Sequence, residues 1–201
     1  NTPPVLSSTY SAGGEVPYAR AGNPTWSALE DVLAALEGPG CRALTFASGM
    51  AAISAVVDLV PVGGLVVAPR MVYSGTRALL TESARSGRIR LREVTPGQLP
   101  DSVDGAAMVW VETPTNPMLD VIDIGATVSA ARGQTLVVVD STFATPLGQH
   151  PLAVGVGGGI GVDVEHVQPR HMRHRRGVVA QRHAQHFVQV GCRVGADQQN
   201  P

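Results

Sequence analysis

Short apolar runs alternate with helix-forming stretches along most of the chain, and this alternation constrains the fold more than any other feature. Strands are expected at 42–46, 65–68, 89–94, 107–111 and 136–139. Helices are expected near 49–60, 73–86 and 123–132, and a first helix begins at Pro24 and ends at Gly38. We therefore predict an α/β fold with a mainly parallel sheet flanked by helices.

Polar residues follow these strands directly, at the sheet edge where such folds bind ligands. Ser48 and Gly49 open a helix, where free backbone N–H groups bind anions. Tyr73 follows the second strand and Asn116 follows the fourth. Asp140 ends a buried strand, and a carboxylate there needs a partner, for which a cationic or protonated ligand group is suitable.

Each of these residues also has a purely structural interpretation. Ser48 is a good helix cap, the pair Asn116 and Pro117 is common in turns, and Tyr73 is suited to helix packing. At the level of single residues, both interpretations stay open.

Composition excludes several classes of protein. A net charge of −1 gives no general attraction to nucleic acid or to an acidic membrane. Cys41 and Cys192 are the only cysteines, so there is no disulfide framework, and no apolar run reaches the roughly 18 residues of a membrane span. We expect a cytoplasmic enzyme or binding protein.

Five segments together resemble the pyridoxal-phosphate enzymes of cysteine and methionine metabolism, which include cystathionine γ-synthase, cystathionine γ-lyase, methionine γ-lyase and the O-acetylhomoserine sulfhydrylases. The segments occur in the family's order: PYARAGNPTW at 17–26, FASGMAA at 46–52, VYSGT at 72–76, VETPTNP at 111–117 and VVVDSTFATP at 137–146. The resemblance implies part of the large domain of the fold-type I pyridoxal-phosphate enzymes, over residues 1–153. It implies γ-elimination or γ-replacement on a sulfur amino acid.

The resemblance also implies roles for individual residues. Ser48, Gly49 and Met50 would hold the phosphate of pyridoxal 5'-phosphate at the helix N-terminus. Tyr73 would stack on the ring and is the expected catalytic residue, and Asn116 would bind the ring hydroxyl oxygen. Asp140 would keep the ring nitrogen protonated, which makes the ring an electron sink.

Further implied contacts involve Thr142 and the neighbouring subunit. Thr142 matches a position that supports the ring or the phosphate. Tyr18 and Arg20 match residues that reach the phosphate of the adjacent subunit, so a homodimer or homotetramer is expected. Neither nucleic acid nor a membrane is expected as a partner.

One essential group of the family is missing. The family's lysine, which forms a Schiff base with the cofactor, has no counterpart, because all 15 basic residues counted as Lys plus Arg are arginine. Arginine cannot replace it, since guanidinium stays protonated. We therefore expect the chain to be inactive as written, and the alternative is a non-catalytic cofactor-binding or interaction protein.

Residues 154–201 form a separate, non-family tail in this interpretation. The tail holds five of the six histidines, and its composition shows no helix or strand period. Metal binding through His171 and His174 or through His183 and His186, and nucleic-acid binding by the run at 166–177, are weaker alternatives. We expect a disordered or out-of-frame tail and no metal site.

Overall fold

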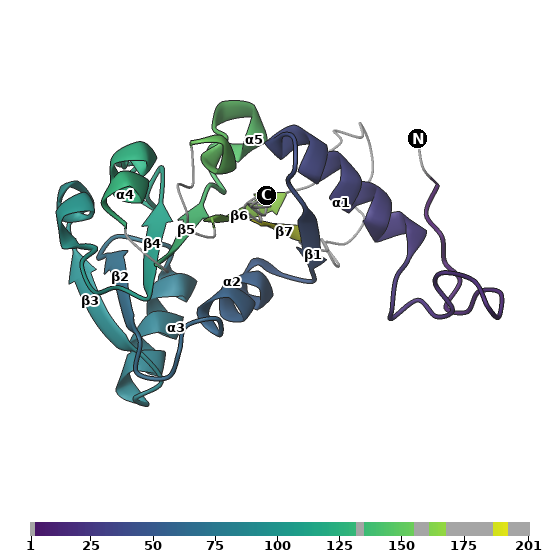
Figure 1. Ribbon diagram of the computed structural model, residues 1–201, viewed down its shortest axis with the longest axis horizontal. Helices are drawn as coiled ribbons and strands as arrows, with labels where there is room; N and C mark the ends of the chain where they lie inside the picture. The colour runs from purple at the N-terminus through teal and green to yellow at the C-terminus, as the bar shows by residue number, and fades with distance from the viewer. Residues whose placement is uncertain (1–2, 132–134, 155–160, 168–186, 193–201) are drawn as a thin grey trace, which may run out of the picture.

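A single mixed sheet forms the centre of the protein (Figure 1). The computed structural model describes residues 3–131, 135–154, 161–167 and 187–192, the last two ranges as backbone only. The strands are β1 (Ala43–Phe46), β2 (Leu65–Pro69), β3 (Arg90–Val94), β4 (Met108–Glu112), β5 (Leu136–Asp140), β6 (Gly161–Val167) and β7 (Phe187–Cys192). Their order in the sheet is β1-β7-β6-β5-β4-β2-β3. β7 is antiparallel to both neighbours, whereas the pairs from β6 to β3 are parallel. The predicted α/β fold is confirmed.

Helices connect the strands close to the predicted positions. They are α1 (Pro24–Glu37), α2 (Gly49–Val57), α3 (Ser74–Arg85), α4 (Ile124–Ala130) and α5 (Thr145–Gly148), with short 3-10 turns η1 (Pro96–Gln98), η2 (Pro100–Ser102) and η3 (Pro151–Ala153). Side-chain caps begin three of the helices, because the first amides of a helix have no partner within it. The caps of α1, α2 and α4 are Asn23, Ser48 and Asp123.

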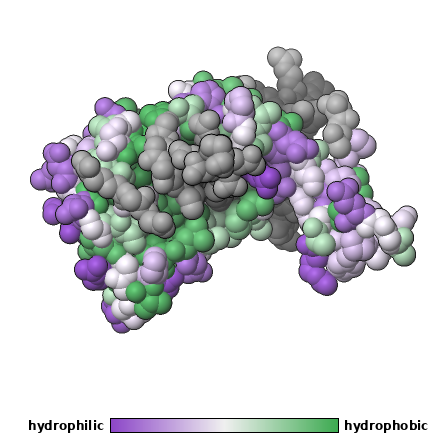
Figure 2. All heavy atoms as spheres, in the orientation of Figure 1, coloured by the Kyte–Doolittle hydropathy of each residue, from purple (hydrophilic) through white to green (hydrophobic). Residues whose placement is uncertain are grey.

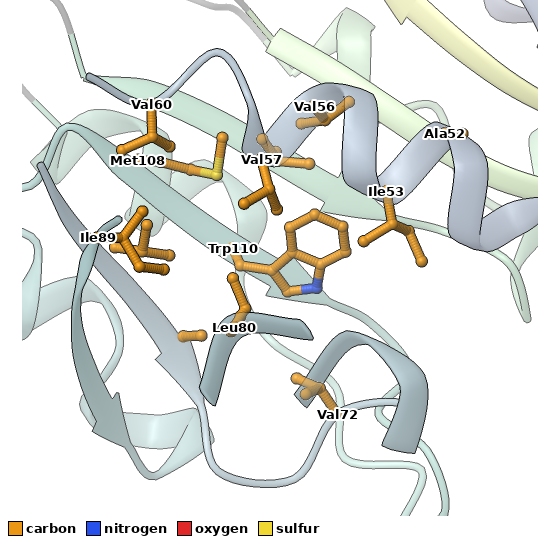
Figure 3. Close-up of a cluster of buried hydrophobic side chains, with 13 residues drawn as sticks. Ala52, Ile53, Val56, Val57, Val60, Val72, Leu80, Ile89, Met108 and Trp110 are labelled. Atoms are coloured by element: carbon orange, nitrogen blue, oxygen red, sulfur yellow. The ribbon is translucent and has the colours of Figure 1, made fainter. Parts of the chain in front are cut away.

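Strands β2, β4 and β5 bury both of their faces, as inner strands of a sheet covered on both sides do. On β4, Met108 and Trp110 belong to one apolar cluster and Val109 and Val111 to the other. The first cluster packs under α2 and α3. Figure 3 shows the Trp110 indole between side chains of α2 and Leu80 of α3. This packing fixes where the residues that follow β2, β4 and β5 lie.

The segment 3–22, ahead of α1, extends away from the sheet (Figure 1). It is tied back near α1, where the Val5 N–H donates to Thr25 Oγ1 at 2.8 Å and Asn23 Nδ2 donates to the Val5 carbonyl at 3.3 Å. An isolated bridge pairs Thr9 with Tyr18. This arm is therefore placed by a few local bonds rather than by a core.

Strands β6 and β7 lie in the segment for which the sequence predicted no regular structure, so that expectation is corrected for these two stretches. β6 pairs in parallel with β5, from Val137 opposite Gly161 to Asp140 opposite Val164. The physical reason is that β5 otherwise presents a row of unpaired backbone groups, which any extended segment can satisfy. Valines at 162 and 164 and at 188 and 190 alternate with other residues, a weak strand signal that glycine-rich and arginine-rich surroundings obscured.

Apolar residues gather in the left half of the face shown in Figure 2, and hydrophilic residues line the rim beside β3. The hydrophilic rim agrees with the pattern of β3, in which the exposed residues Arg90 and Arg92 alternate with partly buried ones. Among the described residues, no helix combines the length and the apolar character that crossing a membrane requires. In the same residues, no group of three or more metal-binding side chains comes together.

Candidate functional site

Two carboxylates end neighbouring strands at one edge of the sheet. Glu112 is the last residue of β4, Asp140 is the last residue of β5, and the two are opposite each other in the parallel register. Each is only 4% exposed. Because burial penalises a charged carboxylate, two such groups side by side indicate a site built for a particular partner.

Glu112 joins the two loops that carry Tyr73 and Asn116. Its Oε2 accepts the backbone N–H of Tyr73 at 2.8 Å, and its Oε1 accepts the backbone N–H of Asn116 at 2.8 Å. The pKa of Glu112 is raised to about 7, chiefly by burial. The nearby Asp140 also raises this pKa, and the hydrogen bonds from the two amides offset part of the rise. Near neutral pH this carboxyl group is therefore poised between its charged and neutral forms.

Asp140 is held by the turn that follows it. Thr142 donates to Asp140 Oδ1 twice, from its Oγ1 at 2.6 Å and from its backbone N–H at 3.1 Å. Burial raises the pKa of Asp140, and the bonds from Thr142 oppose the rise. A cationic donor beside the carboxylate would favour its charged form further.

The turn from β1 into α2 reaches the same edge through Met50. Ser48 caps α2, accepting the Ala51 N–H at 3.2 Å, so its capping interpretation holds in the structure. A Cβ placed on Gly75 would lie 2.6 Å from Met50 Sδ and 2.6 Å from Tyr73 Cε1. Met50 and the Tyr73 ring therefore meet over Gly75, which brings the N-terminus of α2 beside the Tyr73 loop.

Buried threonines hold the loop after β4 in place. Thr113 and Thr115 are both 0% exposed. Thr113 Oγ1 accepts the Ile122 N–H at 3.0 Å, and Thr115 Oγ1 accepts the Asp120 N–H at 2.9 Å. Gln149 Nε2 donates to the Thr113 carbonyl at 3.2 Å and to Ser141 Oγ at 2.9 Å, which ties this loop to the turn after β5.

Most of the residues singled out from the sequence thus share one sheet edge, while two do not. Ser48 caps α2, which begins with Gly49 and Met50. Asp140 is one of the two carboxylates, and hydrogen bonds to this pair come from Tyr73, Asn116 and Thr142. Tyr18 and Arg20 lie on the exposed arm, where the Arg20 guanidinium stacks 4.7 Å above the Tyr18 ring. In Figure 1 this arm lies at the far side of α1 from β4 and β5. The histidines at 171, 174, 183 and 186 lie outside the described residues.

Sequence reasoning missed three residues that organise the site: Glu112, Gly75 and Gln149. A signal existed for Glu112, since it ends a buried apolar strand just as Asp140 does. Gly75 lies inside a helical pattern, where a glycine without a turn or cap role indicates close packing. No local pattern marks Gln149, because its partners lie 36 and 8 residues away.

Comparison with known proteins finds relatives among cystathionine lyases and synthases. Cystathionine γ-lyase of Dictyostelium discoideum is 40% identical over 160 residues, which are 77% of this chain and 39% of that protein. Cystathionine β-lyase of Staphylococcus haemolyticus is 42% identical over 144 residues, 69% of this chain and 36% of that protein. The crystal structure of cystathionine γ-synthase from Xanthomonas oryzae superposes with a TM-score of 0.77 at 29% identity, covering 96% of this chain and 49% of that one.

The chain thus spans less than half the length of these relatives. The family signature covers residues 5–164 and so extends past residue 153, where the sequence resemblance was drawn. On the strength of that match, this chain belongs to the Cys/Met metabolism PLP-dependent enzyme family.

Proposed function

We propose that this chain is the cofactor-binding part of a pyridoxal-phosphate-dependent trans-sulfuration enzyme. The substrates would be sulfur amino acids such as cystathionine, and the reaction would be γ-elimination or γ-replacement at a carbon–sulfur bond. The observation that carries the proposal is the buried Asp140 carboxylate, which lies beside Glu112 and next to the loops of Tyr73 and Asn116. The relatives include both lyases and a synthase by name, so the choice between these reactions is left open.

The residues present fit pyridoxal phosphate. Asp140 uses Oδ1 for both of its bonds from Thr142, and burial raises its pKa, because a buried carboxylate is penalised unless a positive partner lies beside it. A protonated pyridine nitrogen supplies the missing positive charge. The first amides of α2, at Gly49 and Met50, suit a phosphate group, because a helix N-terminus combines free N–H donors with a positive dipole end.

Each residue would have a distinct task. The α2 amides bind the phosphate, the flat face of Tyr73 packs on the ring, and the Asn116 side chain donates to the ring oxygen. Asp140 holds a proton on the ring nitrogen, and Thr142 orients that carboxylate. The cofactor, when bound, supplies an electron-accepting ring that stabilises negative charge developing on the substrate carbon.

The proposal includes assembly across a subunit interface. Tyr18 and Arg20 are exposed and extend away from the sheet edge of their own chain, which is compatible with contacts to the phosphate site of a second copy in a dimer or tetramer. A cytoplasmic location is also part of the proposal.

A second candidate function is cofactor binding without turnover. It is favoured by the absence of lysine from all 201 residues, since no side-chain ε-amine can attach the cofactor covalently. Incubation with pyridoxal phosphate and cystathionine separates the two functions. Release of ammonia or a keto acid supports the enzyme, whereas saturable binding without release supports the second candidate.

Binding itself is tested with Asp140→Asn and a matched control, Asp101→Asn, at an exposed residue of η2. Removing a charged hydrogen-bond partner costs about 1.5–3 kcal/mol, so the dissociation constant for pyridoxal phosphate should rise about 10-fold to 150-fold in Asp140→Asn. The control should bind like the wild type. Equal affinity in all three proteins would refute the assignment of Asp140.

A further inference from the structure

Glu112 is a buried titratable residue to which the proposed function gives no task. It is 4% exposed, and both of its carboxylate oxygens accept hydrogen bonds from backbone amides. These amides belong to different loops, one 39 residues before Glu112 and one 4 residues after it. A single side chain therefore connects the loop after β2 with the loop after β4.

The connection acts on the backbone of the two residues that would face the ring. The Tyr73 N–H lies at the start of α3, where Tyr73 occupies the cap position without making a side-chain cap bond. Glu112, from another strand, accepts the amide of this cap residue itself. The Asn116 N–H is bonded by the other oxygen, so a movement of Glu112 would shift both residues together.

We propose that Glu112 is a positioning residue, whose carboxylate sets the placement of the Tyr73 ring and the Asn116 amide relative to Asp140. The proposal rests on the proposed function for the identity of the ligand. Glu112 does not itself contact the ring in this arrangement. It acts through the two residues that do.

The chemistry of the side chain explains why a carboxylate is needed at this position. An ionised carboxylate offers acceptors on both oxygens, whereas a carboxamide offers one acceptor and places an N–H₂ group where the other stood. Glutamine at this position would still accept a hydrogen bond from one of the two backbone amides. Its NH₂ group would face the N–H of the other amide, so two donors would point at each other. Asp140, from the adjacent strand, is the charged group that faces Glu112 across the register.

Amide hydrogen exchange on the cofactor-free protein tests the positioning directly. In Glu112→Gln, exchange at Tyr73 or Asn116 should accelerate about tenfold, the equivalent of one hydrogen bond of about 1.4 kcal/mol, while core amides of β2 and β4 stay protected. The control Glu82→Gln makes the same chemical change at an exposed residue of α3, which pairs with Arg85, and should leave both amides unchanged. A uniform acceleration across the sheet, or none at either amide, would overturn the proposal.

The wild type provides a measurement that does not depend on the variant folding. Tyr73 and Asn116 amides should exchange more slowly than the amide of Met118, which has no hydrogen bond within the described residues. Equal exchange at all three would also overturn the proposal.

The affinity for pyridoxal phosphate completes the test. Glu112→Gln should weaken binding about tenfold while Glu82→Gln binds normally, and unchanged affinity in Glu112→Gln would refute a positioning role toward the ligand. If the wild type does not bind pyridoxal phosphate at all, the proposed function fails. The exchange measurements would then still decide whether Glu112 fixes the two loops.

Discussion

Replacing Gly75 by alanine should disturb the geometry of the candidate site while changing the stability of the fold very little. Gly75 is the second residue of α3, and a Cβ there would lie 2.6 Å from Met50 Sδ, 2.6 Å from Tyr73 Cε1 and 3.1 Å from Tyr73 Cζ. Carbon atoms in contact normally lie about 3.5–4.0 Å apart. Both the Met50 thioether and the Tyr73 ring must therefore move by about 1 Å.

The net effect on stability should be small. Alanine is favoured over glycine in a helix by about 0.5–1 kcal/mol, which offsets part of the crowding, and crowding in a rigid core costs about 1–3 kcal/mol. Here the atoms that clash are the ends of two side chains, and Tyr73 is 42% exposed, so they can rotate away. We expect the free energy of unfolding to change by less than about 1 kcal/mol.

The effect on the site should be larger. A well-placed aromatic contact contributes about 0.5–1.5 kcal/mol, so displacing the Tyr73 ring should raise the dissociation constant for pyridoxal phosphate about 2-fold to 10-fold. Gly125→Ala is the matched control, since Gly125 is also the second residue of its helix. Its added Cβ would meet Asp123 Oδ1 at 3.3 Å and Val154 Cγ1 at 3.5 Å, and neither contact involves the site.

Urea unfolding followed by circular dichroism gives the stabilities, and titration with pyridoxal phosphate gives the affinities. Gly125→Ala should be as stable as the wild type or more stable, with unchanged affinity. If Gly75→Ala binds as tightly as Gly125→Ala, the Tyr73 ring does not contribute to binding from its place over Gly75, and the reasoning is wrong.

Three further predictions follow from the packing, the capping and the electrostatics. Leu80→Ala should lower the free energy of unfolding by about 2–5 kcal/mol in urea titrations, because Leu80 is 1% exposed within the cluster around Trp110. Asn23→Ala should cost about 1 kcal/mol by removing the cap on the Thr25 N–H and should speed proteolysis of the arm, whereas Asn23→Asp should keep the cap. In the folded protein the pKa of Glu112 is about 7, above its ordinary value of 4.5, so folding favours the protonated carboxyl group. This stabilisation is complete below about pH 4.5 and is lost as the pH rises through 7, which lowers the free energy of unfolding by up to about 3 kcal/mol. Urea unfolding between about pH 5 and about pH 8 should show this decline, and a decline of the same size in Glu112→Gln would contradict it.

The order and type of the helices and strands from α1 to β5 could be predicted because their signals are local. Asn23 and Pro24 mark the start of α1, and Gly38, with φ of 119°, marks its end. The valines of β5 and the Asp140 that ends it predicted both a buried strand and a ligand-facing carboxylate. Positions just after parallel strands converge whatever the strand order, so Tyr73, Asn116 and Asp140 could be grouped without knowing it.

The remaining features depend on partners far apart in the sequence. No local pattern states that β5 pairs with β4 on one side and β6 on the other. The bond from the Tyr73 amide to Glu112 could not be inferred for the same reason, although a carboxylate at the end of β4 was visible. The contact of Met50 and Tyr73 over Gly75 requires the relative placement of α2 and α3, which the sheet core determines.

The absence of lysine leads to a final prediction about the gene. β6 pairs in parallel with β5, and the family match ends within it, at residue 164. The sequence after residue 167 carries arginine and histidine and no lysine. The frame change was expected near codon 155, but the family match runs to residue 164, so we now place it beyond that residue. There it would account for the missing lysine and for the changed composition with one event. The nucleotide sequence, translated in another frame from that point, should encode a Ser-x-x-Lys segment followed by roughly a further domain's length of open frame. Stop codons soon after this point in both other frames would refute the idea, and the lack of lysine would then be a property of the protein itself, which favours binding without turnover.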